Sequence, residues 1–435
     1  MSARAKRSVD EFARELVEEA LAKGASAAQA RAVDADYVEM QFDNRGVDLV
    51  RSTKNRAAAI TVYKDGKRGS ASLNSADPAE VSSALDAAMT AAQAGLPDPA
   101  NDVAEAPSLP PSAHGPEAPD RPAMGAAIEA FLDRRARDFP LIRTRDCNYS
   151  FSATDTGFAN SKGVRQRERR AHYGFSALFM AKDGARTTSM NYVGAESFAP
   201  FDDPFRAGSL ARLLEETVQS LERKPVPEKF VGDVIVTPDC LSSLLWPILG
   251  ALSGSALFAG TSPFKNRKGE AIASPLFSLR NEPRDAASPG GADFDGFGVP
   301  TRNLNVVEKG VLEEFLVDFF FSKKLGMPQT AGAHKLSVAA GETPLAEIVA
   351  NTRRGIVFSR FSGGAPNANL DFTGIAKNSF YVEDGQIRHA LEETMVSGNF
   401  QELLKNVHAV SRESVDFGGG SYPFVAASGV TISSK

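Results

Sequence analysis

Apolar side chains in the first 25 residues recur at helical spacing. Val9, Phe12 and Leu16 lie on one stripe, which predicts an amphipathic helix. Ser8 and Glu11 form a capping box at its start, which fixes the expected first turn. The chain therefore opens with an ordinary surface helix that packs one face on a core.

A sheet-like region follows over residues 27–73, where apolar and polar residues alternate. Asp65-Gly66 lies inside it and predicts a tight hairpin. A second helix follows, with Asp77 as its cap, Pro78 in its first turn and Gly95 at its end. Helix, strands and helix in this order predict an N-terminal α+β region over residues 1–95.

The rest of the chain divides by composition. Residues 96–122 hold eight of the 25 prolines and predict an extended connection. Residues 123–228 predict a helix near 123–137 followed by antiparallel strands. Residues 229–435 predict a strand-rich, barrel-like domain with hairpins that turn at Lys309-Gly310 and Asp384-Gly385. The fold class predicted for the whole chain is α+β.

One long stretch, "LLWPILGALSGSALFAG" from 244 to 260, carries no charge. A membrane span needs about 20 apolar residues, but this run contains Pro247, several glycines and several serines and lacks flanking basic clusters. Leucines and isoleucine keep helical spacing, so we expect a buried helix over 241–257. Its small residues, Gly250 and Gly254 among them, would permit close approach by another backbone.

Composition narrows the classes of function. A net charge of −5 disfavours a general nucleic-acid binder. Two cysteines in 435 residues are too few for a disulfide framework. The N-terminal segment turns charged at once and lacks the apolar core of a signal peptide. We therefore expect a cytoplasmic protein with neither a nucleic-acid partner nor a membrane partner.

Catalytic motifs are hard to find in this chain. The five histidines are scattered, and neither HExxH nor HExxxH occurs, so a helix-borne zinc pair is excluded. Cys240 reads as a buried structural thiol and Ser253 as a small packing residue, because no paired base marks either. The basic stretch "RQRERRAH", 165–172, reads as the solvated face of a strand, and "ADFDGFGVPTR", 292–302, as a turn before a strand.

Several segments taken in series resemble the TldD/PmbA family. They are "DGKRGSAS", then "FDGFGVPTRNLNVVEKGVLEEFLVDFFFSKKLGMPQTAGA", then "LDFTGIAKNSFYVEDGQIRHALEETMVSGNFQELLKNV". Their order and spacing run from about residue 8 to the C-terminus. The chain departs from the family at Asn369 and Leu370, where members often have Thr-Gly.

The resemblance implies a two-subunit metalloprotease. One subunit type carries HExxxH on a buried helix and a late cysteine as third ligand, and the other type lacks them. Here the corresponding helix is the charge-free run, and Gly418 to Ser421 stand where the cysteine would be, so all three ligands are missing. The implied shell of a metal site without its metal consists of Gly250, Ala251, Ser253, Gly254 and Gly419. The candidate peptide-binding loop consists of Gly363, Gly364, Asn367, Asn369, Asp371, Phe372, Thr373 and Gly374.

Three alternative functions are compatible with the sequence. The first is a metal-free, non-catalytic subunit that pairs with a zinc-bearing TldD-like relative to cleave unfolded or leader peptides. In it, zinc is expected only in the partner, and this chain binds no cofactor. The second is a stand-alone homodimer that binds peptides without catalysis. The third is a hydrolase that uses Cys240 or Ser253.

Overall fold

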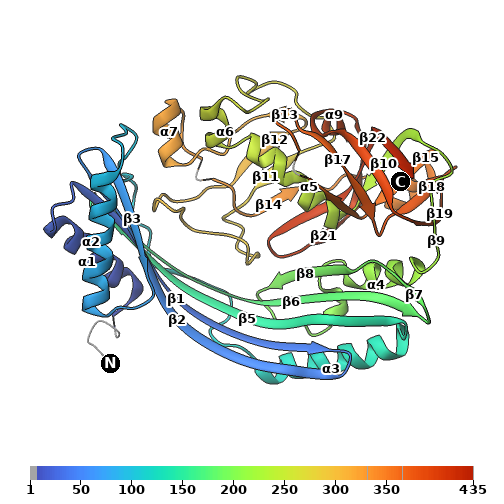
Figure 1. Ribbon diagram of the computed structural model, residues 1–435, viewed down its shortest axis with the longest axis horizontal. Helices are drawn as coiled ribbons and strands as arrows, with labels where there is room; N and C mark the ends of the chain where they lie inside the picture. The colour runs from blue at the N-terminus through green and yellow to red at the C-terminus, as the bar shows by residue number, and fades with distance from the viewer. Residues whose placement is uncertain (1–6, 331, 365, 435) are drawn as a thin grey trace.

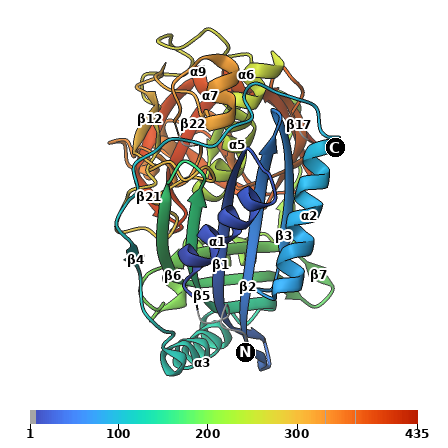
Figure 2. The ribbon, with the colours of Figure 1, turned by 90° about the vertical axis from the view of Figure 1, so that its left-hand side faces the viewer.

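The computed structural model describes residues 7–330, 332–364 and 366–434. The chain forms two lobes on either side of a seam (Figure 1). The lower lobe is a long, strongly curved sheet with helices on its convex side. The strand-rich second lobe lies over the concave side, as both views show (Figures 1 and 2). The predicted α+β class with a strand-rich second half is confirmed.

The first sheet is built on four long antiparallel strands, two from each side of the proline-rich connection. Its strand order is β3-β2-β1-β5-β6-β4, and β7 and β8 also pair with β6. β1 pairs with β5 along residues 29–42, so one sheet runs across the predicted divisions at 95 and 122, which stay a prediction. The bounds are β1 Ala27–Asp43, β2 Gly46–Lys64, β3 Lys67–Leu73, β4 Ser112–His114, β5 Ile142–Asn160, β6 Arg165–Asp183, β7 Arg186–Thr187 and β8 Asn191–Ser197.

Helices cover the convex face because alternate strand residues on that side are apolar. Along β1, Val38, Met40 and Phe42 are buried in a cluster with Phe131 of α3. The predicted capping box is present, since the Ser8 N–H donates to Glu11 at 3.1 Å. The helices are α1 Val9–Ala22, α2 Pro78–Ala94, α3 Arg121–Asp138 and α4 Leu210–Gln219, with the 3₁₀ turn η2 Pro204–Arg206.

The second lobe is organised around β22, Gly420–Ser434. This strand pairs with β10, β14, β20 and β21. The hairpin turns predicted at Lys309-Gly310 and Asp384-Gly385 are confirmed, and all four residues have the positive φ that such turns need. The remaining strands are β9 Arg223–Lys224, β10 Phe230–Val236, β11 Leu279–Asn281, β12 Leu304–Glu308, β13 Val311–Leu312, β14 Leu336–Val338, β15 Arg354–Phe358, β16 Arg360–Gly363, β17 Asp371–Lys377, β18 Phe380–Glu383, β19 Gln386–Leu391, β20 Thr394–Asn399 and β21 Val407–Asp416. The short helices α7 Phe319–Leu325, α8 Leu345–Ala350 and α9 Phe400–Lys405 complete the lobe.

The charge-free run forms two helices, so the single helix predicted over 241–257 is wrong. α5 spans Pro238–Ala251 and α6 spans Gly254–Ala259. At the break, the Leu316 N–H donates to the Leu252 carbonyl and the Gly254 N–H to the Leu316 carbonyl, each at 3.0 Å. These long-range bonds replace helical ones. In the described parts of the chain, no helix is both long and apolar enough to cross a bilayer.

The expected close approach at the small residues holds at one glycine and fails at another. A Cβ on Gly254 would lie 2.6 Å from the Cβ of Phe321 in α7. A Cβ on Gly250 would meet nothing within 4 Å. Only the first of these glycines is required by packing, because Gly250 lines an open groove.

Candidate functional site

The concave face of the first sheet carries small and polar residues and is not covered by the described helices. Ser150, Gly174 and Glu196 stand opposite one another across β5, β6 and β8, and Ser176 stands opposite Gly194 in the next row. The intervening residues point to the helices and are buried: Tyr149, Phe175 and Ala195. The floor therefore offers hydroxyls, backbone and one carboxylate rather than an apolar surface.

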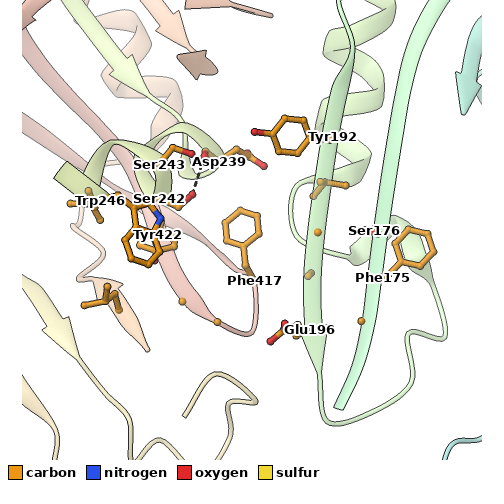
Figure 3. Close-up of a pocket in the computed structure, with 18 of the residues that line it drawn as sticks. Phe175, Ser176, Tyr192, Glu196, Asp239, Ser242, Ser243, Trp246, Phe417 and Tyr422 are labelled. Carbon is orange, nitrogen blue, oxygen red and sulfur yellow. Dashed lines mark hydrogen bonds between the residues drawn. The ribbon is translucent and has the colours of Figure 1, made fainter. Parts of the chain in front are cut away.

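The opposite wall is α5, which presents Ser242, Ser243 and Trp246 (Figure 3). Trp246 is 67% exposed. The β21–β22 hairpin supplies the end of the wall with Phe417, Gly419, Gly420 and Tyr422. Together these residues and the sheet line the interlobe cavity, which is open to solvent and has a volume of about 460 Å³. This volume lies in the range of ligand pockets.

Charges in the interlobe cavity are mostly compensated. Asp239 of α5 forms an ion pair with Arg212, which also binds Glu216 at 2.8 Å. The Arg360 guanidinium lies 3.4 Å from the ring centroid of Tyr192. Burial lowers the pKa of Arg360, although nearby Tyr192 and Asp239 oppose the shift. Asp239 and Arg360 thus serve mainly to hold the walls in place.

Glu196 differs from Asp239 and Arg360, because its contact with an ionisable partner is long. Its carboxylate lies 3.8 Å from His172 Nε2, and 44% of its side chain is exposed. In the close-up it projects from β8 into the gap, with Trp246 and Phe417 across from it (Figure 3). The cavity therefore combines an acidic group with aromatic rings, which suits an extended chain with exposed amide N–H groups.

Family models match two parts of the chain. Residues 229–434 match the PmbA/TldA metallopeptidase C-terminal domain, and residues 28–92 match the PmbA/TldA metallopeptidase domain 1. Together they cover more than half of the chain. The chain belongs to the PmbA/TldD family. The wall of the interlobe cavity that α5 and the β21–β22 hairpin form lies inside the larger match, whereas its floor on β5, β6 and β8 lies outside both matches.

Curated relatives of this chain are named as metalloproteases. The metalloprotease PmbA homolog of Haemophilus influenzae is 24% identical over 282 residues, which cover 63% of this chain and 61% of the relative. The metalloprotease PmbA of Escherichia coli O157:H7 is 21% identical over 260 residues, which cover 59% of this chain and 57% of the relative. The chain thus spans less than two thirds of the length of these relatives.

Solved structures share the fold over nearly the whole chain. A protein titled a modulator of DNA gyrase from Bacteroides thetaiotaomicron has a TM-score of 0.86 at 22% identity and covers 98% of both chains. TldE from Thermococcus kodakarensis has a TM-score of 0.81 at 20% identity, covering 97% of this chain and 100% of its own. At such identities these likenesses show the fold.

Membership of a metallopeptidase family raises the question of whether this PmbA/TldD chain could hold zinc. A catalytic zinc needs about three N, S or O ligands from the protein. Within the described residues, neither a histidine nor a cysteine lines the interlobe cavity, and Asp239 is already bound to Arg212. The donor groups present do not fit a zinc ion. That this chain binds no zinc stays a prediction.

Cys240 and Ser253 do not form a nucleophilic site. Cys240 is 2% exposed, and burial raises its thiol pKa further above neutrality, so it stays protonated. The Ser253 hydroxyl donates to the Gly250 carbonyl at 2.7 Å and caps α6 through the Ala256 N–H. Their surroundings hold them in structural roles.

The candidate peptide-binding loop and part of the implied metal-site shell come together on the far side of Trp246. Gly250 and Ala251 line the α5 groove, a second cavity of about 620 Å³, opposite Gly363, Gly364 and Asn367. Trp246 and Ser243 border both this groove and the interlobe cavity. Gly419 lies in the interlobe cavity, and Ser253 and Gly254 line neither space, so the shell residues do not form one site.

Side-chain amides hold the loop in shape. Asn367 and Asn399 donate to Asp371 at 2.9 and 2.8 Å, and these bonds lower the Asp371 pKa. Phe372 stacks on Phe400 with centroids 4.6 Å apart and is buried. Leu370 has a φ of +68°, a conformation that favours glycine, at one of the two positions where the chain departs from the family. The remaining members of the loop set lie in or next to β17: Asn369, Thr373 and Gly374.

Sequence reasoning missed a buried ionic cluster. His114, Glu168 and Asp293 offer ligand atoms within 4.8 Å of one another. Arg170 binds Glu168 at 2.5 Å, and Arg284 binds Asp293 at 2.7 Å, so the two carboxylates are already neutralised. A dication is therefore disfavoured there. The reading of 165–172 as a solvated face is wrong for Glu168 and Arg170, which the second lobe covers. The sequence held one signal of this: within "RQRERRAH", Gln166 and Glu168 alternate with arginines, as expected for a strand whose two faces have different surroundings.

Proposed function

We propose that this chain is the metal-free, non-catalytic subunit of a PmbA/TldD-type metalloprotease that cleaves unfolded or leader peptides. The observation that carries the proposal is α5, which faces the interlobe cavity with Ser242, Ser243 and Trp246 where a metalloprotease would need ligands. The metal chemistry would come from a zinc-bearing relative. This chain would hold the peptide.

The walls of the two spaces beside Trp246 suit an extended peptide. β16 pairs with β17 on one side, and no second strand partner occurs among the described residues. Its last two residues, Ser362 and Gly363, are exposed, and Gly363 borders the α5 groove. A free strand edge binds peptide main chain regardless of side chain. A folded protein has no free main chain to offer, which accounts for a preference for unfolded substrates.

The decisive assay measures cleavage of an unfolded peptide by this chain alone, by its zinc-bearing relative alone, and by the two together, each with and without a chelator. We expect hydrolysis in the mixture, loss of it with chelator, and none from this chain alone. Chelator-resistant cleavage by this chain alone would sink the proposal. So would full activity of the relative without this chain.

A further inference from the structure

A third cavity lies along the same concave face as the interlobe cavity. On β5, Ser150 lines the interlobe cavity and Thr154 lines this one, which is four residues further, or about 13 Å in a strand. We call it the Arg31 cavity. It holds about 320 Å³ between β1, β5 and β6 on one side and the 291–296 segment of the second lobe on the other. An extended peptide in the interlobe cavity would reach it within a few residues.

The carboxylates that line the Arg31 cavity are already engaged. Glu168 accepts from the Arg170 guanidinium at 2.5 and 2.8 Å. Asp295 accepts from the Phe297 and Val299 N–H groups, both at 2.9 Å, and also from Gln329 at 2.9 Å. Neither carboxylate is therefore open to a further cation, and Arg170 is neutralised by Glu168.

Arg31 has no such partner. Its guanidinium makes no hydrogen bond or ion pair with any residue in the described ranges, while its side chain stays exposed to the cavity. Desolvation by the surrounding protein lowers the pKa of Arg31, and the charge of Glu168 opposes the shift. Among the described charged side chains that line the cavity, Arg31 is thus the one with no hydrogen-bond or ion-pair partner, whereas the oxygens of the Asp295 carboxylate are occupied by neutral N–H donors. A guanidinium binds carboxylates through a planar fork of N–H donors.

We propose that Arg31 forms a carboxylate-binding subsite for a peptide that extends from the interlobe cavity into the Arg31 cavity, away from Trp246. The inference rests on the proposed peptide-holding function and names the chemistry selected there. The ligand is either the C-terminal carboxylate of the peptide or an aspartate or glutamate side chain, placed about four residues from the segment opposite Ser150.

The test is the affinity of three fluorescein-labelled unfolded peptides that differ by one group. The first ends in an amide and has no acidic residue, the second ends in a free carboxylate, and the third ends in an amide and has one internal aspartate. Fluorescence anisotropy gives Kd for the wild-type chain and for Arg31→Gln, Arg31→Lys and Arg165→Gln. Arg165 lies on β6 but on the other face of the sheet, so Arg165→Gln removes the same charge outside the cavity.

We expect one or both carboxylate peptides to bind the wild type about tenfold more tightly than the first peptide, as one charge-assisted pair gives. Arg31→Gln should abolish that difference, Arg31→Lys should keep part of it, and Arg165→Gln should keep all of it. Equal Kd values for the three peptides would overturn the subsite and leave the peptide-holding function standing. A chain that binds none of the peptides would overturn both.

Discussion

Two glycines of the charge-free run have opposite surroundings, which makes them a matched pair at the scale of single residues. Gly254 starts α6 against Phe321, and a Cβ there would lie 2.6 Å from the Phe321 Cβ. Gly254→Leu must push α7 away, so we expect the free energy of unfolding to fall by about 1–3 kcal/mol. Thermal unfolding measures it.

The control is Gly250→Ala in the last turns of α5. A Cβ there meets nothing within 4 Å, and alanine is the better helix former, so the midpoint should stay or rise by the equivalent of about 0.5–1 kcal/mol. An unchanged midpoint in Gly254→Leu, or a large drop in Gly250→Ala, would show that the packing of this run is misassigned.

At the scale of elements, a single carboxylate ties the strand β4 to the second lobe. Asp293 accepts from Ser112 at 2.5 Å and contacts His114 Nε2 at 2.9 Å, both in β4. Burial raises the Asp293 pKa, but these bonds and the charge of Arg284 outweigh it and hold the pKa below its usual value. A folded-state pKa below that of the unfolded chain, about 3.9, stabilises the fold above that pH.

Asp293→Asn should therefore lower the free energy of unfolding at neutral pH by about 1–3 kcal/mol, because a buried charged acceptor is lost. The difference from wild type should shrink below about pH 4, where the wild type loses the same contribution as Asp293 is protonated. Urea unfolding at both pH values gives the comparison. Asp146→Asn is the control, since that side chain is 75% exposed. A difference that does not depend on pH would contradict the ionic role.

Local signals predicted most single elements. Caps at Ser8 and Asp77 and the turn at Asp65-Gly66 depend on a few adjacent residues, and all appear in the structure. The break between α5 and α6 could not be foreseen, because it depends on backbone bonds to Leu316, about 60 residues away along the chain. The same holds for the cluster of His114, Glu168 and Asp293, whose members come from three distant segments.

At the scale of the whole molecule, one side chain would report the peptide binding proposed above. Trp246 is its single tryptophan, and it borders both the interlobe cavity and the α5 groove. Binding of an unfolded peptide should cover the indole and shift its emission to shorter wavelength, while a folded protein should leave it unchanged.

Trp246→Phe should remove the emission change and keep most of the affinity, whereas Trp246→Ala should weaken binding about tenfold or more, as loss of a buried aromatic anchor does. Anisotropy of a labelled peptide measures both variants. Full affinity in Trp246→Ala would place the peptide elsewhere on the molecule.

The shared first sheet has a consequence for biosynthesis. β1 can pair with β5 only after the ribosome has synthesised the proline-rich connection and β5 itself. The Ala28 N–H, for example, donates to Ser161 Oγ, which lies 133 residues later in the chain. At about 5–20 residues per second, a nascent β1 waits roughly ten seconds for that strand. During this interval the β1–β2–β3 meander presents an open edge, which is the kind of surface that chaperones shield and that aggregation exploits. In a fragment that ends near residue 95, β5 is missing and the edge of β1 would stay unpaired.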